Sequence, residues 1–133
     1  MTMDAKTSAI QNLAAVDVHA HVGNYRKGRH KLVERCMSAS AEEVVQRAKA
    51  ARTEMTVFSH IEALLPPGKA NVIRANRAAA RIAESQKALR FWAVLNPRQA
   101  DTFSQARDLL AHPKCAGLKI HPELHLYPIS KHG

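Results

Sequence analysis

Two histidines separated by one residue lie in a short apolar stretch, Ala-Val-Asp-Val-His-Ala-His-Val at residues 15–22. Because side chains alternate across a β-strand, Asp17, His19 and His21 are expected on one face of such a strand, opposite the apolar residues. Two imidazoles on one face can bind a single divalent ion, and imidazole suits zinc, iron, nickel or cobalt. The spacing predicts that His19 and His21 are metal ligands. A hydrogen-bonded polar network without metal is the alternative, because buried polar groups need partners.

A second polar pair, Lys119 and His121, lies in the stretch Gly-Leu-Lys-Ile-His-Pro at residues 117–122. The two side chains are expected on one face of a strand, at its carboxyl end. There they could stabilise developing negative charge or orient a substrate carboxylate. We predict that Lys119 and His121 act on the substrate; in the alternative, Lys119 pairs with a carboxylate, either Asp17 or Glu123.

Other polar residues carry weaker signals. His60 and Asn96 each end an apolar stretch, and the strand register decides whether they face the site. We expect four histidines to be structural or solvated: His30, His112, His125 and His132. Neither cysteine, Cys36 or Cys115, has an evident base beside it in the sequence, so nucleophilic catalysis is not expected.

Short apolar runs alternate with longer amphipathic ones, which is the pattern of βα units in an α/β fold. We predict strands at residues 15–22, 55–60, 90–96 and 116–121, all parallel, and helices that start at Ser40, near Ala70 and at Asp101. Ser40 and Glu43 form a capping-box pattern, and Asp101 is expected to cap the third helix. We expect that helix to bury Phe103, Ala106, Leu109 and Leu110, and the segments 23–39 and 123–133 to contain no helix.

Composition fits one partial domain over residues 1–133, with 46% hydrophobic residues. No run approaches the roughly 18 apolar residues of a membrane span, and the first residues have no apolar signal region. Two distant cysteines indicate reduced thiols in a cytoplasmic protein. The net charge of +9 gathers partly in residues 26–35 and in Arg74, Arg77 and Arg81. With few aromatic residues and no nucleic-acid motif, we interpret these as a basic loop and a solvated helix face rather than a nucleic-acid site.

The motifs Asp-Val-His-Ala-His-Val-Gly and Gly-Leu-Lys-Ile-His-Pro-Glu resemble those of the amidohydrolase-related metal-dependent hydrolases, within the branch that includes amidohydrolase-type decarboxylases. The resemblance runs from about residue 14 to the end. It implies the N-terminal half of a (β/α)8 TIM-type barrel with a divalent metal ion, zinc first, at the carboxyl ends of the strands. His19 and His21 match the family's ligand pair on the first strand. The family's later ligands, from strands five, six and eight, have no counterpart here.

The resemblance implies a hydrolase that acts on C–N or C–O bonds of a small-molecule substrate, or a related decarboxylase. A (β/α)8 barrel takes about 250 residues, and catalytic zinc usually has three protein ligands. We therefore expect the isolated chain to have little or no turnover. It could be the first half of a longer enzyme, a truncated product, or a half-barrel completed as a homodimer. The alternative function is a non-catalytic fragment or interaction module.

Overall fold

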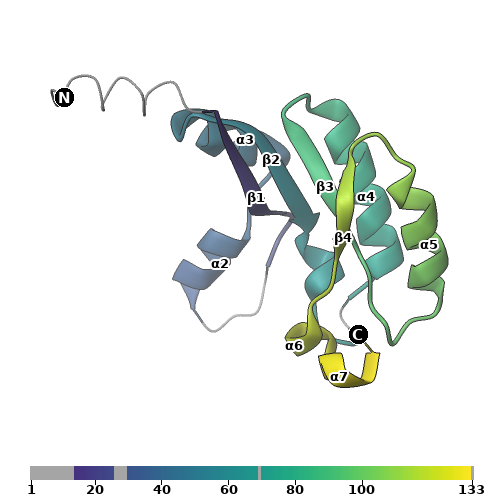
Figure 1. The fold of residues 1–133 in the computed structure, drawn as a ribbon. Coiled ribbons are helices and arrows are strands. Elements are labelled where there is room, and N and C mark those ends of the chain that lie inside the picture. Colours follow the sequence, from purple (N-terminus) through teal and green to yellow (C-terminus); the bar gives the residue numbers. More distant parts are fainter. Residues whose placement is uncertain (1–13, 26–29, 69, 133) are drawn as a thin grey trace, which may run out of the picture.

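The computed structural model describes residues 14–25, 30–68 and 70–132, and the chain has an α/β fold (Figure 1). The basic residues Arg26, Lys27 and Arg29 lie outside this part. The elements in chain order are β1 (Ala15–Val22), α2 (Lys31–Met37), α3 (Ala41–Ala50), β2 (Thr53–His60), the 3-10 helix η1 (Ile61–Leu64), α4 (Val72–Ser85), β3 (Leu89–Val94), α5 (Asp101–Leu110), β4 (Cys115–Lys119), α6 (Pro122–His125) and α7 (Ile129–His132).

The strands form one parallel sheet in the order β1-β2-β3-β4, which confirms the predicted α/β class and the four parallel strands. The helices α3, α4 and α5 connect successive strands and cover one face of the sheet (Figure 1). Parallel strands joined in this way have their carboxyl ends at the same end of the sheet. His21 near the end of β1 and Lys119 at the end of β4 therefore lie toward the same end of the sheet, on its two opposite edge strands.

The core lies between the sheet and its covering helices. Phe58 of β2 and Phe91 of β3 are fully buried there against Ala79 and Ala83 of α4. Inside α4, the Asn76 amide donates to the Val94 carbonyl and accepts from the Val94 backbone N–H, both at 2.9 Å. These bonds fix the helix to the carboxyl end of β3.

The two predicted helix caps differ in outcome. The capping box of α3 is confirmed, because Ser40 Oγ accepts from the Glu43 backbone N–H at 3.2 Å while Glu43 Oε2 accepts from the Ser40 N–H at 2.7 Å. For α5 the prediction is wrong: the N-cap residue is Ala100, and Asp101 is the first helical residue.

The predicted buried face of α5 is also partly wrong. Phe103 and Leu110 are 48% and 51% exposed, whereas Thr102 and Ala106 are buried. The Thr102 hydroxyl donates to the carbonyl of Asn96 at 2.9 Å. This polar contact with the turn after β3 brings the Thr102 side of the helix inward, which the apolar spacing alone does not reveal.

Helices form in both segments where none was expected. No residue of α2 is buried, and its N-cap residue, His30, makes no side-chain cap bond, so its sequence signal is weak. The start of α6 is better defined: His121 Nδ1 accepts from the Leu124 backbone N–H at 3.3 Å, and Pro122 occupies the first turn. Proline is favoured there because its missing N–H would have no helical partner.

Strands β1 and β4 form the two edges of the sheet, and both expose large apolar side chains. Val16 and Val18 of β1 are 50% and 58% exposed, Leu118 of β4 is 43% exposed, and Ile120, just after β4, is 44% exposed. The expectation that Val16 and Val18 pack on the helices is wrong; the β1 residues that join the core cluster are Ala20 and Val22. Within the described ranges, no helix has the length and apolar character needed to cross a membrane.

Candidate metal centre

Strand β1 brings the imidazoles of His19 and His21 together. Their ring centroids lie 5.2 Å apart and their planes are inclined by 25°. The strand pairs His21 with Ser59 of β2, while Ala20 and Val22 pack on the helix side. His21 therefore lies on the sheet face that the helices leave open, and the ring of His19 stacks beside it.

Asp17 does not extend this row of side chains. Its Oδ1 accepts the backbone N–H of His19 at 2.9 Å, so the carboxylate binds the main chain beside the histidines. It still lines, with His19 and His21, a cavity of about 520 Å³ beside β1, α2 and α3. The three residues are thus neighbours, but Asp17 holds the strand rather than facing out with the imidazoles.

The environment of His21 keeps its imidazole neutral. Burial, together with the charges of Lys119, His19 and His121 and against a smaller opposing effect of Asp17, lowers the pKa of His21 to about 4. Its Nδ1 is buried and has no hydrogen-bond partner among the described residues. A neutral imidazole is the form that binds a metal ion.

The charges of Lys119 and His121 depress the pKa of His21, although β1 and β4 are the opposite edge strands of the sheet. The predicted strand face shared by Lys119 and His121 is wrong, because β4 ends at Lys119 and His121 is the N-cap residue of α6. Burial lowers the pKa of Lys119 itself. Burial, followed by the charges of His125 and Lys119, lowers the pKa of His121. In the part of the chain that the structure describes, Lys119 forms no salt bridge, so its alternative pairing with Asp17 or Glu123 is not observed.

His125 has a larger structural role than its sequence position suggested. Its side chain is fully buried, and Nε2 donates to the Ala63 carbonyl at 2.9 Å. Burial lowers the pKa of His125. The imidazole anchors α6 on η1 and thereby positions His121, the N-cap residue of α6. The tail sequence offered no periodic pattern that would have revealed this contact.

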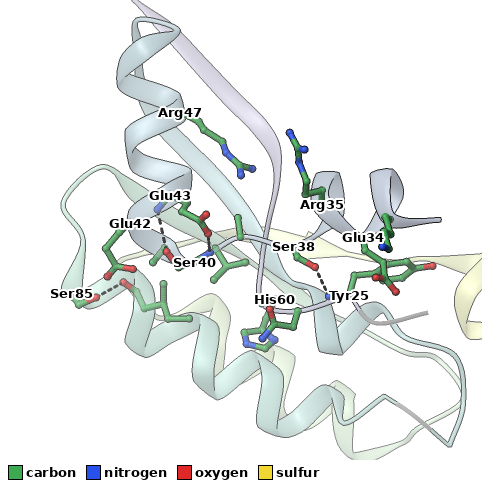
Figure 2. Close-up of a pocket in the computed structure, with 17 residues that line it drawn as sticks. Tyr25, Glu34, Arg35, Ser38, Ser40, Glu42, Glu43, Arg47, His60 and Ser85 are labelled. Carbon is green, nitrogen blue, oxygen red and sulfur yellow. Dashed lines mark hydrogen bonds between the residues drawn. The ribbon is translucent and has the colours of Figure 1, made fainter. Parts of the chain in front are cut away.

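His60 and Asn96 do not join the His19–His21 pair. His60 follows Phe58 on the helix-covered side of β2 and lines a second cavity, of about 900 Å³, between α2, α3 and α4 (Figure 2). Burial lowers the pKa of His60, which agrees with this enclosed position. Asn96 is buried, and its Oδ1 accepts the Arg98 N–H at 3.1 Å in the turn after β3.

Charged residues of both signs line the larger cavity. Figure 2 shows Arg35 from α2 and Arg47 from α3 on one side, with Glu42, Glu43 and Ser85 on another. None of the four predicted site residues, His19, His21, Lys119 and His121, is among its lining residues. The chemistry predicted from the sequence therefore belongs to the open sheet face and not to this cavity.

The histidine pair fits part of a metal centre. Two imidazoles bound tetrahedrally to one zinc ion, at about 2.0–2.1 Å from nitrogen to metal, have ring centroids roughly 5 Å apart. The observed centroids are 5.2 Å apart, and the two rings are stacked with an interplanar angle of 25°. In residues 14–25, 30–68 and 70–132, however, no group of three or more His, Cys, Asp or Glu side chains is arranged to hold a metal ion. The described residues thus bring two imidazoles together without a third side chain of these types.

Comparison of the chain with models of known protein families gives no match, and neither curated proteins nor solved structures match it. The functional argument therefore depends on the residues and the geometry described above.

Proposed function

We propose that this chain is the N-terminal half of a (β/α)8 barrel of the amidohydrolase-related type. Two features support a barrel over a doubly wound sheet. The described strands follow each other in sequence order, without a reversal, and α3, α4 and α5 lie on one face only. Doubly wound sheets carry helices on both faces and reverse their strand order, whereas barrels keep their helices outside.

In this proposal His19 and His21 bind a divalent metal ion, with zinc as the first candidate. The observation that carries it is the pair itself: two imidazoles 5.2 Å apart, of which His21 has a pKa of about 4 and is neutral at pH 7. When bound, such a metal lowers the pKa of a coordinated water toward 7 and polarises a substrate carbonyl.

The reaction class that fits is hydrolysis of a C–N or C–O bond in a small molecule, or metal-dependent decarboxylation. The charges of Lys119 and His121 act on His21 across the carboxyl end of the sheet. Both can donate hydrogen bonds to a negatively charged oxygen, either a substrate carboxylate or the oxygen that gains charge during attack on a carbonyl. They would orient the substrate against the metal.

Two imidazoles are one fewer than the three protein ligands usual for catalytic zinc. We therefore expect weak metal binding and little turnover from this chain alone, in a cytoplasmic setting suited to its two free thiols. The remaining ligands would come from another segment, and a second copy of the chain is one candidate. The exposed apolar residues on β1 and β4 favour a second function to be tested beside this one, a non-catalytic module that binds a partner through these edges.

Isothermal titration with Zn²⁺ tests the metal site. Wild-type protein is compared with His19→Ala and His21→Ala, and with His112→Ala as the matched control. His112 Nε2 lies 3.0 Å from Glu84 Oε1, at the amino end of β4 and away from His19 and His21. We expect either site variant to weaken zinc binding at least tenfold and the control to leave it unchanged. Equal zinc binding by His19→Ala, His21→Ala and wild type would refute the metal site.

Size-exclusion chromatography with metal analysis separates the two functions. A dimer with about one zinc ion per two chains supports a barrel completed by association. A metal-free chain that associates through its edges supports the interaction module.

A further inference from the structure

Strand β1 loses its regular pairing at the residues that carry the histidines. Asp17 pairs with Thr56, and Ala20 pairs with Phe58. An advance of three residues along β1 therefore matches an advance of two residues along β2. One extra residue in a strand is a β-bulge, which re-aims side chains and leaves main-chain groups outside the ladder. Among the described residues β1 is an edge strand, and none of these residues forms a strand on its other side.

Two side chains bind the main chain of this irregular segment. Asp17 Oδ1 accepts the His19 N–H, and Trp92 Nε1 donates to the Val18 carbonyl, both at 2.9 Å. The first contact is local. The second comes from β3, so the indole must pass over β2 to reach β1. It therefore ties the two strands together independently of the ladder.

The face on which Trp92 lies is the same one that carries the histidines. Its neighbours Phe91 and Ala93 are buried in the cluster that contains Ala79 of α4. Because side chains alternate along a strand, Trp92 projects from the opposite, open face. Val57 of β2, which alternates with Phe58, is only 4% exposed, as expected if the indole covers it.

Strand β4 leaves room for the indole at Gly117, the residue paired with Trp92. A Cβ atom on Gly117 would lie 3.1 Å from Trp92 Cζ3. Phenylalanine would supply an apolar ring at position 92, but only tryptophan adds an N–H that can reach a distant carbonyl. Three strands thus contribute to one contact: Gly117 leaves space, Trp92 donates and Val18 accepts.

We propose that Trp92 is a positioning residue for the His19–His21 pair. Its bond to the Val18 carbonyl, together with the Asp17 bond to the His19 N–H, holds the bulged segment so that the two imidazoles remain 5.2 Å apart. The consequence for metal binding rests on the proposed function, whereas the ordering of β1 is a property of the metal-free chain. Groups that orient metal ligands typically change metal affinity 10–100-fold when they are removed.

The test uses Trp92→Phe, which removes the N–H and keeps an aromatic ring. Asn71→Ala is the matched control: it removes the side-chain cap of α4, an Asn71 Oδ1 contact with the Arg74 N–H at 3.0 Å, and leaves the sheet untouched. Two quantities are measured, the Zn²⁺ affinity by isothermal titration and the amide hydrogen exchange of residues 18–21 without metal. We expect Trp92→Phe to bind zinc about tenfold more weakly and to exchange faster at these residues, with the control unchanged in both.

If the smaller ring destabilises the fold, the isostere benzothienylalanine replaces the indole N–H by sulfur with nearly the same shape. Because the chain has one tryptophan, replacing tryptophan with this analogue changes position 92 alone. Wild-type zinc affinity and wild-type exchange in either variant would overturn the inference. If wild-type protein binds no zinc, the metal proposal fails, and the exchange of residues 18–21 still decides whether Trp92 orders β1.

Discussion

Replacing Gly117 with alanine tests the contact between β4 and Trp92 most directly. Gly117 has a φ of +145°, a region that residues with a side chain rarely adopt. A strained backbone of this kind costs about 1–3 kcal/mol. In addition, the new methyl group would lie 3.1 Å from Trp92 Cζ3, so the indole would have to move.

The indole cannot move freely, because its Nε1 is 2.9 Å from the Val18 carbonyl. Loss of that hydrogen bond adds about 1 kcal/mol, and the smaller entropy of the unfolded alanine chain offsets about 0.4–1 kcal/mol. We therefore expect Gly117→Ala to lower the free energy of unfolding by about 2 kcal/mol, equivalent to a fall in Tm of roughly 6 °C.

Thermal unfolding followed by tryptophan fluorescence measures both the fall in Tm and the displacement of the indole, because Trp92 is the chain's one tryptophan. The matched control is Gly68→Ala. Gly68 has a φ of +80°, but nothing lies within 4 Å of the added Cβ, so this variant reports backbone strain without a clash. Gly117→Ala should shift the native emission maximum and Gly68→Ala should not. An unchanged emission maximum in Gly117→Ala would refute the reasoning.

Three further predictions concern pH, helix capping and burial. The pKa of His21, about 4, lies below the ordinary 6.5, so the unfolded chain binds the extra proton between these values and stability falls as the pH falls through this window. Between pH 7 and pH 4, the free energy of unfolding of His21→Gln should therefore fall by about 1–2 kcal/mol less than that of the wild type, allowing for partial exposure of the ring. Urea unfolding at the two pH values measures this difference. Identical pH dependence in the variant and the wild type would contradict it. Ser40→Ala should lower the free energy of unfolding by about 1 kcal/mol through loss of the α3 cap, again by urea unfolding, and no change would mean that the capping box contributes nothing in solution. His125→Ala should cost about 3 kcal/mol by leaving a cavity and an unpaired Ala63 carbonyl, seen as a fall in Tm, whereas an unchanged Tm would argue against that anchor.

The sequence predicted the features that depend on local pattern. The bounds of β1, Ala15–Val22, agree to the residue with the predicted strand, and the capping box at Ser40 forms as its motif indicated. The parallel strands are also as predicted, and they place the carboxyl ends of β1 and β4, near His21 and Lys119, at the same end of the sheet.

The remaining features depend on contacts between distant residues. The residues Val16 to Val22 alternate regularly in type, so nothing in their order reveals the register slip after Asp17. The bond between Trp92 and Val18 joins residues 74 positions apart. Likewise, the burial of His125 depends on η1, whose Ala63 carbonyl lies 62 positions earlier. Periodicity carries no information about such pairings.

The one-sided arrangement of helices has an electrostatic consequence. Each of α3, α4 and α5 follows a strand in the chain and begins near that strand's carboxyl end. Their amino termini therefore gather at the end of the sheet where His21 and Lys119 lie. Each helix amino terminus carries a partial positive charge, equivalent to about half an elementary charge. Together with the lysine, these dipoles create a positive potential over that end of the sheet, which would draw anionic molecules toward the imidazoles and oppose the approach of a bare cation. Phosphate or a carboxylate in the buffer should therefore affect how readily the pair takes up a metal ion.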